Sequence, residues 1–116
     1  MTAYLIGTAS SPFRRHPDRD FRSLSEEVVK GALADASIEG SALGSAWFGN
    51  CAMGTWGQDN IRGQVAMTPM LRDGTLPERL PIVNVEGGCV TGSMAFHAAW
   101  KDVLSGQCDL SLAVGV

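Results

Sequence analysis

Residues 83–93 read Val-Asn-Val-Glu-Gly-Gly-Cys-Val-Thr-Gly-Ser and place Cys89 between a predicted strand and a predicted helix. The apolar run that ends at Val85 is typical of a buried strand, and the residues after Val90 are apolar nearly all round a predicted helix. Two glycines, Gly87 and Gly88, permit a sharp turn and leave the backbone bare, so another molecule can approach the sulfur. The stretch therefore predicts a strand–turn–helix unit with a cysteine at its turn.

The position of Cys89 favours reactivity. At or before the first turn of a helix, the unpaired N–H groups and the positive end of the helix dipole favour a thiolate over a thiol. The thiolate is the nucleophilic form. The Gly-x-Ser-x-Gly pattern of a hydrolase nucleophile elbow is absent. The residues alone leave two interpretations open: a nucleophile, or a buried structural cysteine beside glycines needed for tight packing.

Strands and helices are predicted to alternate along the rest of the chain. Apolar runs predict strands over residues 1–8, 45–50, 81–85 and 110–116. Helices are predicted after a capping box of Ser23 and Glu26, from residue 58 with Asn60 as a candidate cap and Ile61, Val65 and Met67 inward, and over 90–104. This β-α-β-α-β-α-β order predicts an α/β fold with a mostly parallel sheet and helices on both faces.

Length and composition limit the classes of protein. The 116 residues are 45% hydrophobic and 18% charged with a net charge of −3, enough apolar residues for the core of one domain. The acidic balance argues against nucleic acid as a partner, and no apolar run approaches the ~20 residues of a membrane span. Three cysteines without a signal-like N-terminus predict free thiols in the cytoplasm. Cys51 and Cys108 lack Cys-x-x-Cys spacing and paired histidines, so no metal site is predicted.

The stretch around Cys89 resembles the nucleophile region of the thiolase superfamily, where a Cys, a small residue, Ser or Thr, and Gly begin a buried helix. Val-Glu-Gly-Gly-Cys-Val-Thr-Gly is most similar to the sterol-carrier-protein-x-like branch of acetyl-CoA acetyltransferases. Three further segments resemble segments of the family and occur in the same order: residues 11–13, 57–62 and 112–116. Ser10 stands where the family usually has Arg. The chain is identified as one thiolase-like domain, residues 1–116, an N-terminal portion expected to be truncated inside its fourth strand.

The resemblance implies an acyltransferase that moves acyl groups between CoA thioesters through an acyl-cysteine, with no cofactor beyond the CoA thioester substrate. The family takes its catalytic histidines and a second cysteine from later residues, so this segment alone is expected to be inactive. His97 lies about 12 Å along the helix from Cys89, too far to act as its base. The implied site residues are Cys89 as nucleophile, Gly87, Gly88 and Gly92 as oxyanion and turn support, and Cys51, Met53 and Gly54 as candidate pocket residues.

The resemblance also implies assembly into a homodimer or homotetramer. The strand that pairs across the dimer axis corresponds to Ile82, Val83, Asn84, Val85 and Glu86. Some members of this branch act with a small separate acyl-CoA-binding subunit, which is another partner that the resemblance allows. Two alternatives stay open: a ketoacyl-synthase or hydroxymethylglutaryl-CoA-synthase-like condensing enzyme, and a non-catalytic binding or scaffold subunit with the same fold.

Overall fold

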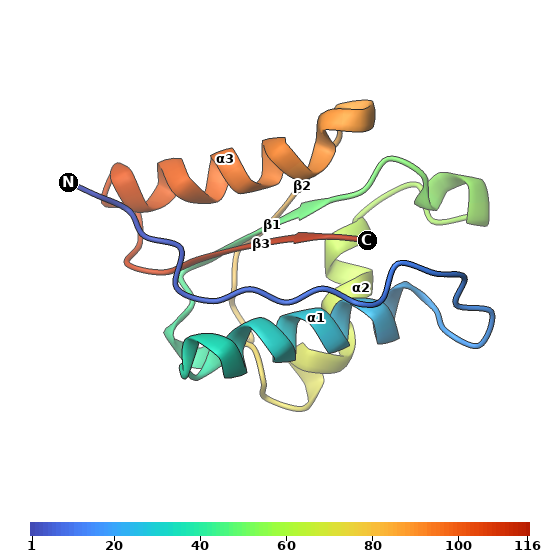
Figure 1. The fold of residues 1–116 in the computed structure, drawn as a ribbon, viewed down its shortest axis with the longest axis horizontal. Coiled ribbons are helices and arrows are strands. Elements are labelled where there is room, and N and C mark those ends of the chain that lie inside the picture. The colour runs from blue at the N-terminus through green and yellow to red at the C-terminus, as the bar shows by residue number, and fades with distance from the viewer.

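Three parallel strands form the central sheet in the computed structural model, which describes all 116 residues (Figure 1). The strands are β1 (Ser45–Gly49), β2 (Ile82–Val85) and β3 (Ser111–Gly115), in the order β2-β1-β3. Three helices connect and flank them: α1 (Phe21–Ala36), α2 (Arg62–Arg72) and α3 (Thr91–Leu104). None of these helices has the length and apolar character needed to cross a membrane. The predicted α/β class with a parallel sheet is confirmed.

The helices cover both faces of the sheet, with α3 on one face and α1 and α2 on the other (Figure 1). Side chains of a strand alternate between faces, and the buried residues of the central strand include Ala46 and Phe48. The core includes these two residues together with Val29 and Leu33 of α1, Ala66, Met67 and Met70 of α2, and Leu112 and Val114 of β3. On the other face of the sheet, α3 buries Ala95 and Ala99 and leaves Phe96 and Trp100 exposed. Only one side of this apolar helix is therefore buried.

The first helix begins three residues earlier than the predicted capping box, so the assignment of Ser23 as N-cap was wrong. Asp20 is the N-cap: its Oδ1 accepts a hydrogen bond from the Ser23 amide at 2.8 Å, and the Ser23 hydroxyl accepts from the Asp20 amide at 3.1 Å. The Ser23 amide lowers the pKa of the Asp20 carboxyl. Glu26 instead accepts a hydrogen bond from Lys30. Aspartate caps a helix as well as serine does, and it leaves Ser23 to serve the reciprocal bond.

The second helix is capped by a distant residue rather than by Asn60, which corrects the prediction. Its N-cap position is Ile61, which has φ 45° and is 61% exposed instead of facing inward. The amide of Gly63 in the first turn donates to Asn84 Oδ1 of β2 at 2.6 Å. A Cβ on Gly63 would lie 2.6 Å from the Cβ of Phe48, so the helix approaches the sheet closely here. Tertiary contacts therefore fix this helix start, and Met67 is buried as predicted.

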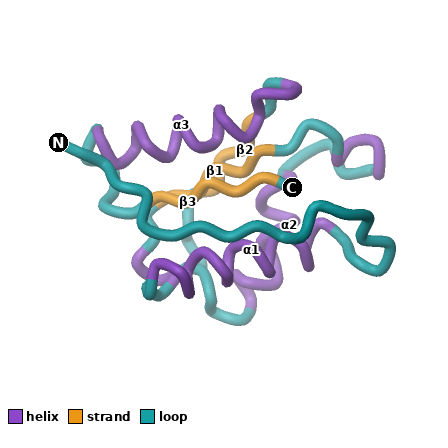
Figure 2. Tube along the Cα trace, in the orientation of Figure 1, coloured by secondary structure: helices purple, strands orange, loops and turns teal.

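The predicted strand over residues 1–8 is wrong, because this extended segment pairs with no strand (Figure 2). It is attached to α1 instead. The Thr8 amide donates to Asp35 Oδ2 at 2.8 Å, and a Cβ on Gly7 would lie 2.5 Å from the Ala32 carbonyl. A strand requires its N–H and C=O groups to pair with a neighbour. The apolar residues Tyr4 and Leu5 remain 78% and 66% exposed.

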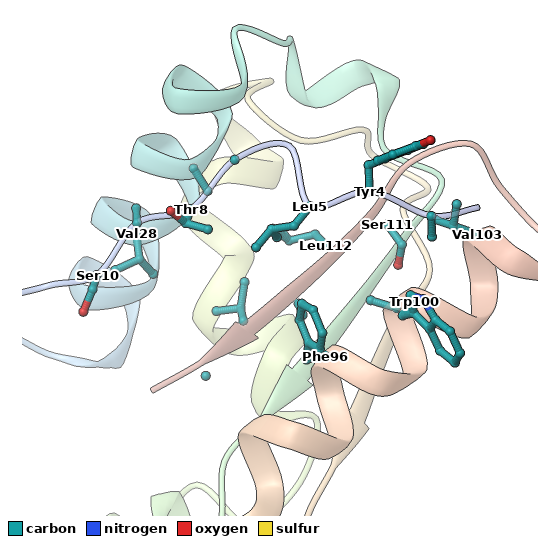
Figure 3. Close-up of a pocket in the computed structure, with 18 of the residues that line it drawn as sticks. Tyr4, Leu5, Thr8, Ser10, Val28, Phe96, Trp100, Val103, Ser111 and Leu112 are labelled. Atoms are coloured by element: carbon teal, nitrogen blue, oxygen red, sulfur yellow. The ribbon is translucent and has the colours of Figure 1, made fainter.

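An open groove of about 760 Å³ lies between this N-terminal segment and β3. Figure 3 shows Leu5, Leu112 and Phe96 around this space. Residues 3–5 and 7–11 contribute one wall, residues 111–115 another, and side chains of α1 and α3 line the rest. The groove therefore separates the two extended segments that the sequence predicted to share a sheet.

Candidate nucleophile site

Cys89 lies in a short 3-10 helix (Gly88–Val90) between the end of β2 and the start of α3. It is exposed and free of any disulfide. The predicted strand–turn–helix arrangement is therefore present, and a buried structural cysteine does not describe this residue. Residues 86–91 are called the cysteine turn below.

Side chains at both ends of the cysteine turn hold its two glycines. Thr91 Oγ1 accepts a hydrogen bond from the Gly87 amide at 3.0 Å and donates one to the Gly88 carbonyl at 2.7 Å. Glu86 Oε2 accepts a hydrogen bond from the Gly88 amide at 2.7 Å. Gly88 has φ +59°, a conformation that L side chains rarely adopt. The turn is thus fixed by glycine conformation and by three hydrogen bonds to flanking side chains.

The two glycines of the cysteine turn and the adjacent Gly92 differ in their contacts. A Cβ on Gly87 would overlap the sulfur of Met94, so any larger residue there would require the Met94 side chain to move. Gly92 is exposed and a Cβ on it would meet nothing within 4 Å. In this conformation the Gly87 and Gly88 amides are bonded to Thr91 and Glu86. These hydrogen bonds support the predicted role of Gly87 and Gly88 in the turn. An oxyanion role for Gly87, Gly88 or Gly92 stays a prediction.

A polar cavity of about 310 Å³ lies beside the cysteine turn, at the carboxyl ends of β1 and β2. Ligands of parallel α/β sheets commonly bind at this edge. Its lining includes Asn50, Arg62, Asn84 and Glu86. Arg62 Nη1 donates to the Asn50 carbonyl at 2.7 Å, and Asn50 Oδ1 accepts from the Ala52 and Met53 amides.

Sequence reasoning did not assign Asn50 and Arg62 to a site. Their place immediately after β1 and at the start of α2 was the available signal. The candidate pocket residues Cys51, Met53 and Gly54 lie on the loop after β1, but none lines this polar cavity or the groove beside β3. Met53 is fully buried in the core and Cys51 is exposed.

The remaining candidate residues lie apart from the cysteine turn. His97 is exposed, with its ring centroid 5.3 Å from that of Trp100. His16 Nε2 lies 2.9 Å from the Pro12 carbonyl. Cys108 Sγ lies 3.5 Å from the Ser45 hydroxyl. No group of three or more His, Cys, Asp or Glu side chains that could hold a metal ion occurs in the structure.

Comparison with known protein families shows which family this chain belongs to. The family described as "Thiolase, N-terminal domain" matches residues 3–116. The chain belongs to the thiolase N-terminal domain family. The predicted resemblance to the thiolase superfamily is thereby confirmed for the chain as a whole.

Curated relatives of this thiolase domain share about a third of its residues. It is 34% identical to the benzoylsuccinyl-CoA thiolase subunit BbsB of Thauera aromatica and 31% identical to an acetyl-CoA acetyltransferase of Methanothermobacter thermautotrophicus. It is 33% identical to human sterol carrier protein 2. Each comparison covers 97% of this chain. The chain spans 27%, 28% and 19% of the lengths of these three relatives.

Proposed function

We propose that the protein containing this thiolase domain transfers acyl groups between CoA thioesters and carries the acyl group on Cys89. The observation that carries the proposal is the exposure of Cys89 on a rigid turn directly before α3. The amino end of a helix favours negative charge, as a thiolate nucleophile requires. The names of the relatives, thiolase and acetyl-CoA acetyltransferase, support the same chemistry.

The proposed reaction has two balanced steps. The Cys89 thiolate attacks the acyl carbonyl carbon of a CoA thioester, a new carbon–sulfur bond forms, and CoA leaves as a thiolate that takes up a proton. In condensation, the enolate of a second acyl-CoA then attacks acyl-Cys89, a carbon–carbon bond forms, and the free thiolate is restored. Thiolysis is the reverse: the Cys89 thiolate attacks the 3-keto carbon of a 3-ketoacyl-CoA, the carbon–carbon bond breaks, the departing acyl-CoA enolate takes up a proton, and a CoA thiolate then releases the acyl group from Cys89. One thioester replaces another in the first step, so neither direction is strongly favoured. Backbone N–H groups near the carbonyl oxygen would stabilise the negative charge that develops on it.

This chain supplies the proposed nucleophile, and neither of its histidines hydrogen-bonds to the Cys89 sulfur. The His97 side chain is exposed, and its ring lies against that of Trp100. We therefore propose that the group that deprotonates Cys89 lies outside residues 1–116, and that these residues alone do not turn over substrate. The three free cysteines support the predicted cytoplasmic location, where thiols stay reduced.

The test compares two exposed cysteines. The full-length protein is incubated with acetyl-CoA, digested, and analysed by mass spectrometry for an acetylated cysteine. We expect the label on Cys89, loss of turnover in Cys89→Ala, and retention of turnover in the matched control Cys51→Ala, whose cysteine is also exposed. A Cys89→Ala enzyme that keeps wild-type turnover would refute the proposal and favour the scaffold alternative. Condensation of a malonyl thioester, without thiolysis of 3-ketoacyl-CoA, would favour the alternative of a ketoacyl-synthase-like condensing enzyme.

We also propose that the protein assembles through β2. This strand pairs only with β1, so its outer edge is free, and Val83 and Asn84 are exposed on it. An unpaired edge is able to pair with the same edge of a second copy. The name of the Thauera relative describes it as a thiolase subunit, which supports a partner chain as well. Sedimentation of the wild type and of Val83→Lys tests this, because a charge at the edge should produce monomers.

A further inference from the structure

We propose that Thr91 is a positioning residue for Cys89: its hydroxyl and its methyl group together fix the cysteine turn on the central strand. The inference rests on the proposed function for Cys89 and assigns a second residue to that site. Thr91 is the first residue of α3 and is only 6% exposed, although it lies two residues from the exposed cysteine.

The hydroxyl of Thr91 closes the turn. It accepts from the Gly87 amide at 3.0 Å and donates to the Gly88 carbonyl at 2.7 Å, so one oxygen satisfies backbone groups on both glycines. The Gly87 amide and the Gly88 carbonyl belong to the two residues before Cys89, and Gly88 has φ +59°. Glycine has a wide choice of backbone conformations. Without the hydroxyl, the two residues before the nucleophile would lose two of the three side-chain hydrogen bonds that hold this conformation, and only the one to Glu86 would remain.

The methyl group of Thr91 locates the turn relative to the sheet. Gly49 is the last residue of β1, and a Cβ on it would lie 2.9 Å from Thr91 Cγ2 and 3.1 Å from the Thr91 carbonyl oxygen. The Thr91 methyl therefore fits closely over the bare backbone at the end of the central strand. Serine would keep the hydroxyl without this contact, and valine would keep the methyl without the hydrogen bonds.

The expected effect is on the chemical step rather than on substrate binding. A misplacement of a reacting group by about 1 Å costs up to about a hundredfold in rate. Thr91→Val leaves the Gly87 amide and the Gly88 carbonyl unpaired, so the turn relaxes and Cys89 loses its fixed position. Thr91→Ser retains both hydrogen bonds and is expected to rescue most of the rate.

The experiment uses the full-length protein and the variants Thr91→Val, Thr91→Ser and Thr68→Val. Thr68 is the matched control, because its hydroxyl also donates to a backbone carbonyl, that of Gln64, but within α2 and away from the turn. Three quantities are measured: kcat, KM, and the rate of Cys89 alkylation by iodoacetamide. Thr91→Val should lower kcat about tenfold or more with KM changed less than about threefold, and should alter the alkylation rate. Thr91→Ser and Thr68→Val should stay within about threefold of wild type.

Wild-type kcat and alkylation rate in Thr91→Val would overturn the proposal, and so would equal losses in Thr91→Val and Thr91→Ser. Should Thr91→Val fail to fold, Gly49→Ala tests the same geometry, since its new methyl displaces Thr91 while the hydroxyl is kept. A reduced kcat with unchanged KM is then expected, and wild-type kcat would overturn the proposal. Alkylation does not depend on acyl transfer, so the role of Thr91 remains testable if Cys89 proves not to carry an acyl group.

Discussion

Removal of the Asp102 carboxylate should weaken the attachment of α3 to the central strand. Asp102 Oδ2 accepts hydrogen bonds from the Ser45 hydroxyl at 2.7 Å and from the Trp47 indole N–H at 2.8 Å. Each hydrogen bond to a charged group contributes about 1.5–3 kcal/mol. Ser45 retains a second partner in Ser111 at 2.7 Å, whereas the indole of Trp47 has no other hydrogen bond in the structure. We therefore expect Asp102→Ala to lower the free energy of unfolding by about 2–4 kcal/mol.

The assay is urea unfolding followed by circular dichroism, with Lys101→Ala as the control. Lys101 is the exposed neighbour of Asp102 on α3 and makes no side-chain hydrogen bond, so its change should stay within about 0.5 kcal/mol. With a slope of about 2 kcal/mol per molar urea, Asp102→Ala should lower the midpoint by about 1–2 M at an unchanged slope. Asp102→Asn, which keeps an acceptor oxygen, should fall between the two. Equal midpoints for Asp102→Ala and Lys101→Ala would refute this account of how α3 is held.

Three further predictions concern turns and the N-terminal segment. Gly88→Ala should destabilise the fold by about 1 kcal/mol or more in thermal unfolding, because Gly88 has φ +59°, whereas Gly92→Ala on the open helix surface should not. Hydrogen bonds from Thr75 lower the pKa of Asp73 from 3.8 to about 2, so the stability from this carboxylate is present above pH 3.8 and lost as pH falls toward 2. Urea midpoints of Asp73→Asn and wild type should accordingly differ at pH 7 and converge near pH 2. Gly7→Ala should release residues 1–8 from α1 and make them more sensitive to proteolysis, since the added Cβ would lie 2.5 Å from a helix carbonyl.

Local pattern predicted most of the elements. The apolar runs around Phe48, Val83 and Leu112 became β1, β2 and β3, and the two glycines before Cys89 became the turn between β2 and α3. These features depend on residues near one another in the chain: strand alternation, glycine conformation, and helical spacing. The same locality explains why the position of Cys89 between a strand and a helix could be predicted from the sequence.

Local pattern was wrong wherever a distant group competed for a backbone hydrogen bond. The helix start near Asn60 depends on Asn84 of β2, which binds the Gly63 amide. Residues 1–8 have the composition of a strand, yet they run alongside α1. Gly7 fits closely against this helix, and the Thr8 amide donates a hydrogen bond to Asp35. Asp102, Ser45 and Trp47 are far apart in the chain and gave no signal of their contact.

Residues near Cys89 were enough to predict a cysteine at a bare turn between a strand and a helix, and to indicate the family that uses such a cysteine. The packed chain was needed to show that Thr91 and Glu86 hold this turn, that Asn50 and Arg62 border a polar cavity beside it, and that the first apolar run is no strand. The two kinds of feature differ in the range of the interactions that fix them. Conformational preference is a property of neighbouring residues, whereas the partner of each backbone N–H and C=O is chosen only when the whole chain packs.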